Sequence, residues 1–220
     1  MRNCSPTLAG IKPASLFTYP GVYANQNGKP GAAHIEERRS RLLAVIAQCS
    51  AGTVSHANHV SVLVWRPCGA LIYVYRPADL MRYLSDPRAM TALVTEGYDV
   101  HNLPASLVHL AARITLASSN AAESAYDGSV CALARNRHCD TGCTCEFPHE
   151  IGYFLGYPYE DVHQFIVQHG ENYKVFGAWK VYTNVEQALT TFDSYRACTQ
   201  YLTYIYQQGC TLGQLVQATR

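Results

Sequence analysis

The segment VSVLVWRPCGALIYVY, residues 60–75, decides the fold class of this chain. Two runs of β-branched and aromatic residues, 60–65 and 70–75, flank the tetrapeptide RPCG. Runs of this composition favour strands, and proline second with glycine fourth suits a type I turn. The segment therefore predicts an antiparallel hairpin.

Segments with helical periodicity surround the hairpin. Prolines suited to a first helical turn open the three segments that follow it, and Asn184 with Gln187 forms a capping pattern before a long final segment. A short helix, broken near Lys12, is expected within residues 4–17, and a loop within 19–33. The other predicted helices cover residues 34–49, 77–84, 87–96, 104–116 and 184–209.

The order of these elements predicts an α+β protein, not a regular alternation of strands and helices. A further strand is expected near residues 174–183, interrupted by Gly177. We therefore expect a small antiparallel sheet, formed by the hairpin and this strand and packed by several helices. A length of 220 residues fits a single globular domain over residues 1–220.

Residues 117–145 lack periodicity and are rich in Ser, Asn, Asp and Gly, which predicts a mobile insertion. Thiolate and imidazole groups gather at its end, and four such ligands can surround Zn or Fe. The spacing matches no standard zinc finger or ferredoxin, so a flexible loop without metal is the alternative. The candidate metal ligands are Cys131, Cys139, Cys143 and Cys145.

Composition narrows the classes of partner. A formal charge of +1 and 15% charged residues indicate no basic stripe, which argues against nucleic acid and an anionic membrane surface. A small neutral ligand or a protein partner fits this balance better. No apolar run reaches the ~18 residues of a membrane span, and no export signal is evident, so the cytoplasm is expected. Nine cysteines, an odd number, then favour thiols or metal ligands over disulfides.

The segment FPHEIGYFLGYPYEDV, residues 147–162, predicts a sharp corner between two helices. Pro148 suits the start of a two-turn helix and Gly156 its end. At about 100° per residue, Ile151, Phe154 and Leu155 share one face, and the opposite face carries His149, Gly152 and Tyr153. Such a corner can hold His149 and Glu150 at the edge of a cleft, and a packed structural turn with a solvated histidine is the alternative.

Cys4 is the candidate nucleophile. If Ser5 caps a helix that Pro6 starts, the Cys4 thiol lies beside a helix N-terminus, where thiolate is favoured. A nucleophilic or redox role needs a base, for which His149 is the leading choice, with Glu150 and Lys12 as helpers. The alternative is an unreactive thiol near a frayed chain end.

Four segments resemble an uncharacterised family of bacterial proteins, typical of anaerobic Firmicutes and known only as a domain of unknown function. They are CSPTLAGIK (4–12), LIYVYRP (71–77), FPHEIGYFLGYPYEDV (147–162) and WKVY (179–182). The family brings no established activity, so the resemblance implies no reaction. Cys4 and His149 fall inside these segments and the cysteine-rich part of residues 117–145 does not, which favours a site built from the first two.

Two hypotheses about function follow. In the first, the chain binds a small molecule or a redox cofactor in a cleft, with Cys4, His149 and Glu150 as catalytic residues. The cofactor-binding residues of that cleft are Lys12, Tyr153 and Tyr157. In the second, the chain is a non-enzymatic module that binds metal or a protein partner through the cysteine-rich loop. Whether the protein is an enzyme stays open, because no phosphate-binding, dinucleotide-binding or hydrolase motif occurs.

Overall fold

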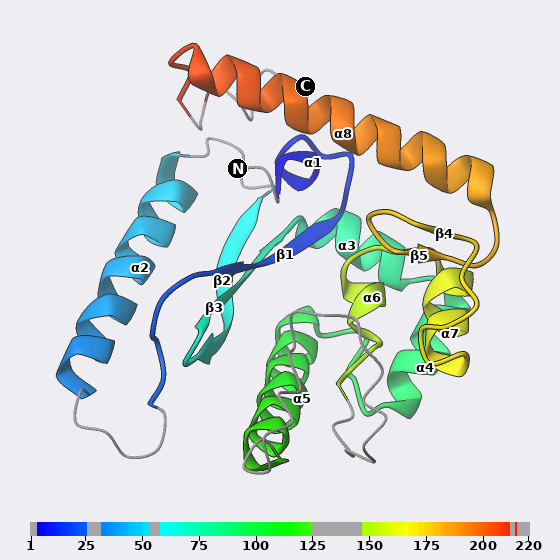
Figure 1. Cartoon of the computed structure of the whole chain (residues 1–220), viewed down its shortest axis with the longest axis horizontal. Coiled ribbons are helices and arrows are strands. Elements are labelled where there is room, and N and C mark those ends of the chain that lie inside the picture. Colours follow the sequence, from blue (N-terminus) through cyan, green and yellow to red (C-terminus); the bar gives the residue numbers. More distant parts are fainter. Residues whose placement is uncertain (1–3, 26–31, 53–57, 125–146, 212–213, 215–220) are drawn as a thin grey trace.

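A three-stranded antiparallel sheet forms the centre of the protein (Figure 1). The structure, a computed structural model, describes residues 4–25, 32–52, 58–124, 147–211 and 214. Strands β2 (His59–Arg66) and β3 (Gly69–Tyr75) form the predicted hairpin, and β1 (Ala14–Tyr19) pairs with the other edge of β3. The α+β class and the hairpin are confirmed.

Strand β1 was not predicted from the sequence, which indicated a helix within residues 4–17 and a loop within residues 19–33. Helix α1 (Ser5–Leu8) ends after one turn, and Gly10 reverses the chain at a φ of +78°. Residues 14–19 then pair with β3 along their full length. Their run of Phe, Thr and Tyr favours a strand. The pairing with β3 decides their conformation, and for this reason the expected helix does not extend into these residues.

The sheet carries an apolar cluster on each face, because successive β3 side chains point to opposite sides. Leu71 and Tyr73 pack with helices on one face. Ile72 and Val74 pack on the other with α1 and with α2 (Ala32–Gly52). The helices of the first face are α3 (Pro77–Leu84), α4 (Pro87–Thr95), α5 (Leu103–Ser124), α6 (Ile151–Phe154) and α7 (Tyr159–Val167).

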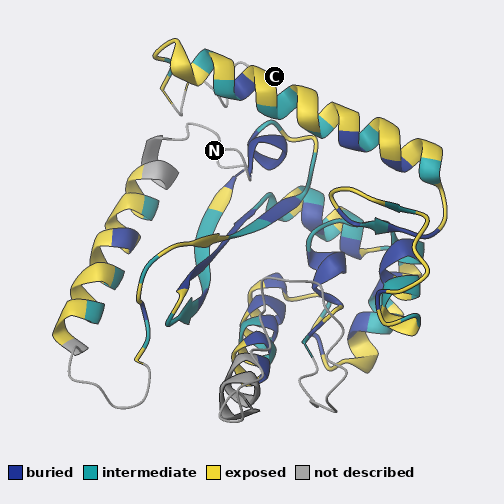
Figure 2. Cartoon of the chain, in the orientation of Figure 1, coloured by how far each residue is buried: buried dark blue, intermediate teal, exposed yellow. Residues whose placement is uncertain are grey.

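Residues 174–183 do form strands, but they do not join the central sheet. Strands β4 (Val175–Phe176) and β5 (Lys180–Val181) pair only with each other, and they pack against α8 (Val185–Gln207). Gly177 permits this arrangement, since a Cβ at that position would overlap the ring of Phe192 on α8. Figure 2 shows that α8 leaves much of its outer face exposed.

The predicted helices over residues 34–49, 77–84 and 87–96 are confirmed within a few residues at each end. Helix α5 is longer than expected, so the predicted insertion is helical over residues 117–124. The rest of that insertion, residues 125–145, lies outside the described residues. Among the described residues, no helix combines the length and the apolar character needed to cross a membrane.

Candidate functional site

Lys12 lies in the link between α1 and β1, against two tyrosine rings. Its Nζ atom is 5.0 Å from the centroid of the Tyr157 ring and 5.9 Å from that of Tyr195. Burial lowers the pKa of Lys12 to about 8 from the usual 10.5, because the surrounding protein removes water from the ammonium group. The amine is therefore much less basic than that of an exposed lysine.

Three distant parts of the chain create this environment. The backbone of Gly156 packs directly on Pro13. This contact brings Tyr157, the residue after Gly156, next to Lys12, the residue before Pro13. The Tyr157 ring stacks on Trp179, with centroids 5.2 Å apart, and Trp179 meets Phe192 of α8 edge-on at 4.6 Å. The α1–β1 link, the α6–α7 corner and α8 therefore converge around one amine.

Asp161 holds the α6–α7 corner to the β4–β5 hairpin. This buried carboxylate accepts hydrogen bonds from Trp179 Nε1 at 2.7 Å and from the backbone nitrogen of Tyr182 at 2.9 Å. Thr183 donates two more, from its backbone nitrogen and its hydroxyl. Asp161 thereby fixes the ring of Trp179 on which Tyr157 stacks.

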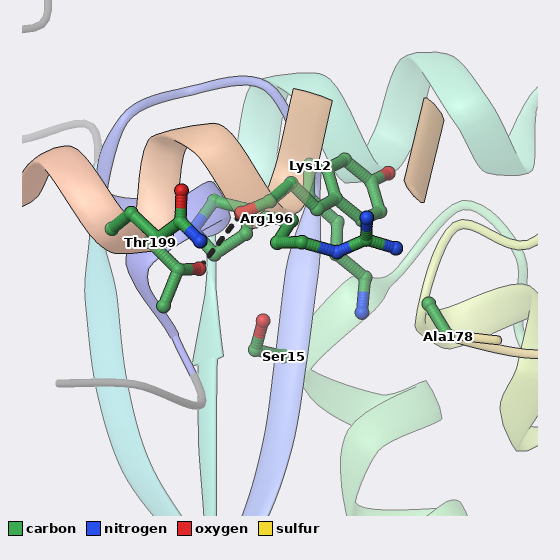
Figure 3. A pocket seen from close by; sticks show the side chains of 8 residues that line it. Lys12, Ser15, Ala178, Arg196 and Thr199 are labelled. Atoms are coloured by element: carbon green, nitrogen blue, oxygen red, sulfur yellow. Dashed lines mark hydrogen bonds between the residues drawn. The ribbon is translucent and has the colours of Figure 1, made fainter. Parts of the chain in front are cut away.

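A hollow of about 320 Å³, open to solvent, lies between this amine and α8 (Figure 3). Among the described residues, two cations, Lys12 and Arg196, line it, and no carboxylate does. Arg196 pairs with Asp193 at 3.0 Å outside the hollow, but both side chains are about two-thirds exposed, so the pair is weak. The remaining lining residues are Pro6, Ser15, Ala178, Tyr195, Thr199 and Gln200.

Of the three predicted cofactor-binding residues, the structure brings Lys12 and Tyr157 together and places Tyr153 elsewhere. Helix α6 has one turn, not the expected two, and all four of its residues are buried. Tyr153 therefore points into the core and not to an open face. Its ring stacks on Tyr159 at 5.8 Å, and its hydroxyl has no hydrogen-bond partner among the described residues.

His149 and Glu150 are neighbours in sequence with different surroundings. His149 is exposed overall, but its ring lies 5.1 Å from Phe165 and 5.8 Å from Phe147. Partial burial of the ring, followed by the nearby His169, holds the His149 pKa below its usual value. Glu150 is buried and accepts from the Tyr98 hydroxyl at 2.8 Å.

Cys4 and the segment just before His149 pack in different apolar clusters. Cys4 is buried in the cluster on the α1 and α2 face of the sheet, whereas Phe147 beside His149 packs on the cluster of the opposite face. The described residues include no group of three or more His, Cys, Asp or Glu side chains arranged to hold a metal. The cysteines of the proposed metal site, Cys131, Cys139, Cys143 and Cys145, lie outside the described residues.

Glu150→Gln should destabilise the fold, because Glu150 is the buried end of an ionic network. Its Oε1 is 2.8 Å from Arg113 Nη1, and Arg113 also reaches the exposed Glu96. We expect the free energy of unfolding to fall by about 2 kcal/mol, measured by urea unfolding. The matched Glu96→Gln should cost less than about 0.5 kcal/mol. Equal losses for the two variants would show that burial of Glu150 is unimportant.

The sequence-based predictions missed several residues around the Lys12 amine, among them Trp179, Tyr195 and Arg196. Trp179 lies in the WKVY segment, one of the four that resemble the uncharacterised family, but the sequence suggested no role for it. Tyr195 and Arg196 lie within the long final helix, where periodicity indicates only which side chains face the core. No sequence signal connects that helix with Lys12.

The sheet, its helices and the hollow define a small α+β protein with a cationic, aromatic-walled candidate binding site. The model of the family described as "Protein of unknown function (DUF3793)" matches residues 1–216, and the chain belongs to this family. No curated protein and no solved structure matches the chain. The resemblance to an uncharacterised domain family is thereby confirmed.

Proposed function

We propose that the protein binds a small anionic molecule in the hollow beside Lys12. The observation that carries this proposal is that Lys12 and Arg196 line the same hollow, to which the described residues contribute no carboxylate. Two cations with no acid among the described lining residues create a locally positive potential, even though the formal charge of the chain is only +1. An anion therefore suits the site better than the neutral ligand that composition favoured.

The other lining groups suit a small organic molecule. A volume of about 320 Å³ is at the lower end of small-ligand sites, which combine apolar walls with a few polar groups. The Tyr195 ring offers such a wall. Ser15, Thr199 and Gln200 supply hydroxyl and amide groups that can orient a ligand.

Isothermal titration calorimetry with citrate and with glucose 6-phosphate tests this proposal, and glucose serves as the uncharged reference. We expect both anions to bind saturably and glucose not to bind. Lys12→Met and Arg196→Gln should each weaken anion binding about tenfold, because each removes one charge from the hollow.

Two matched variants serve as controls. Lys174→Met and Arg82→Gln remove the same charges from exposed positions away from the hollow, and both should leave anion binding unchanged. The proposal is wrong if neither anion binds. It is also wrong if the four variants weaken binding equally, since net charge alone would then explain the effect.

Lys12→Met should also stabilise the protein at neutral pH. Burial disfavours the ammonium form in the folded state, so the folded pKa of about 8 lies below the usual 10.5. Below pH 8 the amine is charged in both states, and its desolvation costs on the order of 2 kcal/mol. Between pH 8 and 10.5 the folded wild-type protein loses this proton first, so its stability rises and the advantage of Lys12→Met shrinks.

Urea unfolding of both proteins from pH 6 to pH 10.5 measures this difference. Lys174→Met is the control, because Lys174 is exposed, and its stability should stay within about 0.5 kcal/mol of wild type throughout. An advantage of Lys12→Met that grows with pH would contradict the assigned burial of the amine.

The finer hypotheses from the sequence stay predictions. A redox cofactor beside Cys4 and His149 gains no support from the packing of Cys4 and of Phe147, a neighbour of His149, in clusters on opposite faces of the sheet. A metal-binding or protein-interaction role for the cysteine-rich loop concerns residues outside the described ranges.

A further inference from the structure

Lys12 differs from the other described lysines in what its amine contacts. Lys180 Nζ donates to the Gly170 carbonyl at 2.7 Å, and Lys174 Nζ donates to the Thr183 carbonyl at 3.4 Å. Among the described residues, Lys12 Nζ has no hydrogen-bond or ion-pair partner, and it lies over the rings of Tyr157 and Tyr195. An amine held between rings at a hollow keeps its lone pair available when it loses a proton.

The lowered pKa makes that lone pair available near neutral pH. With a pKa of about 8, about a tenth of the Lys12 amine is unprotonated at pH 7. The fraction for an ordinary lysine is below about one in a thousand. Enzymes that form imines through lysine rely on the same desolvation of the amine.

The hollow also contains the groups that an imine-forming reaction needs. Arg196 can bind a carboxylate through paired N–H groups. Burial raises the pKa of the Tyr195 phenol to about 12, so this group stays protonated and can donate a hydrogen bond to a carbonyl oxygen. Tyr195 and Lys12 line the same hollow.

We propose that Lys12 forms a reversible imine with the carbonyl group of an anionic aldehyde or 2-oxo acid bound in the hollow. This inference rests on the proposed function and names the chemical class of its ligand. The unprotonated Lys12 nitrogen adds to the carbonyl carbon, and one proton passes from the nitrogen to the carbonyl oxygen to give a carbinolamine. The carbinolamine hydroxyl then leaves as water with the second proton of the nitrogen, and a C=N bond replaces the C=O bond without any change of oxidation state.

Reductive trapping tests the inference. The folded protein is incubated at pH 7 with glyoxylate and sodium cyanoborohydride, and the carboxymethylated lysines are quantified by peptide mass spectrometry. We expect Lys12 to be modified at least about tenfold faster than Lys174 in the same sample. In guanidinium-unfolded protein the two rates should become similar, because the environment of Lys12 is then lost.

A second arm tests recognition of the anion. Arg196→Gln should lower the modification of Lys12 by glyoxylate about threefold or more, but should not change its modification by neutral acetaldehyde. Arg82→Gln should change neither. A Lys12 that reacts no faster than Lys174 overturns the imine, and equal effects of Arg196→Gln on both aldehydes overturn the anionic class. If citrate or glucose 6-phosphate binds through Lys12 but no adduct forms, only the imine falls and the proposed function stands.

Discussion

Asp161→Asn is expected to lower the free energy of unfolding by about 3–5 kcal/mol, the largest effect of any substitution considered for this protein. Asp161 is 3% exposed, and four donors converge on its two oxygens. An asparagine of the same shape replaces one acceptor oxygen with an NH₂ group. That NH₂ group must face either Trp179 Nε1 or the donors of Tyr182 and Thr183, so at least one buried donor loses its acceptor.

Urea unfolding followed by circular dichroism measures this loss. Asp193→Asn is the matched control, because this substitution makes the same chemical change on the surface of α8, where the Asp193 side chain is 70% exposed. Its effect should be below about 0.5 kcal/mol. If Asp161→Asn is as mild as Asp193→Asn, Asp161 does not anchor the β4–β5 hairpin.

Gly156→Ala is expected to cost about 3 kcal/mol, for two separate reasons. Gly156 has a φ of +71°, where an L-residue with a Cβ is strained. A Cβ there would also overlap Cγ of Pro13, which follows Lys12 directly. Because Pro13 must move away, anion binding beside Lys12 should weaken as well, by about tenfold.

Gly209→Ala separates the two contributions. Gly209 has a φ of +93°, but no atom of the described residues lies within 4 Å of a Cβ at that position. It should therefore lose only the conformational part, about 1 kcal/mol, and keep wild-type anion binding. Unfolding in urea and calorimetric titration with citrate measure both quantities. A Gly156→Ala protein that matches Gly209→Ala in both would show that the contact with Pro13 is not needed.

Local sequence signals predicted the elements that depend on local interactions. Two runs of β-branched and aromatic residues around RPCG predicted the hairpin. The Asp86 side chain caps α4, as predicted, by accepting a hydrogen bond from the Arg88 backbone nitrogen. Elements that depend on a distant partner were missed. Strand β1 directly follows Pro13 and has no clear alternation of apolar and polar residues, and it becomes a strand because β3 offers a free edge.

The candidate site shows the same division. Lys12 and Tyr157 were predicted to bind a ligand, and the structure places them in contact. Tyr153 was assigned to an open face by helical periodicity, but a one-turn helix packed on every side has no open face. Glu150 was assigned to catalysis, and its hydrogen bond with Tyr98 places it in a buried network.

The sequence by itself determined the α+β class, the hairpin and most of the helices, because propensity, capping and periodicity act over a few neighbouring residues. Only the tertiary structure decided which chemistry-bearing residues meet. It places the Lys12 amine beside Tyr157 and Tyr195, and it packs Cys4 and Phe147, a neighbour of His149, in clusters on opposite faces of the sheet. Contacts between residues far apart in the chain depend on how whole elements pack, and desolvation of the Lys12 amine arises only from that packing.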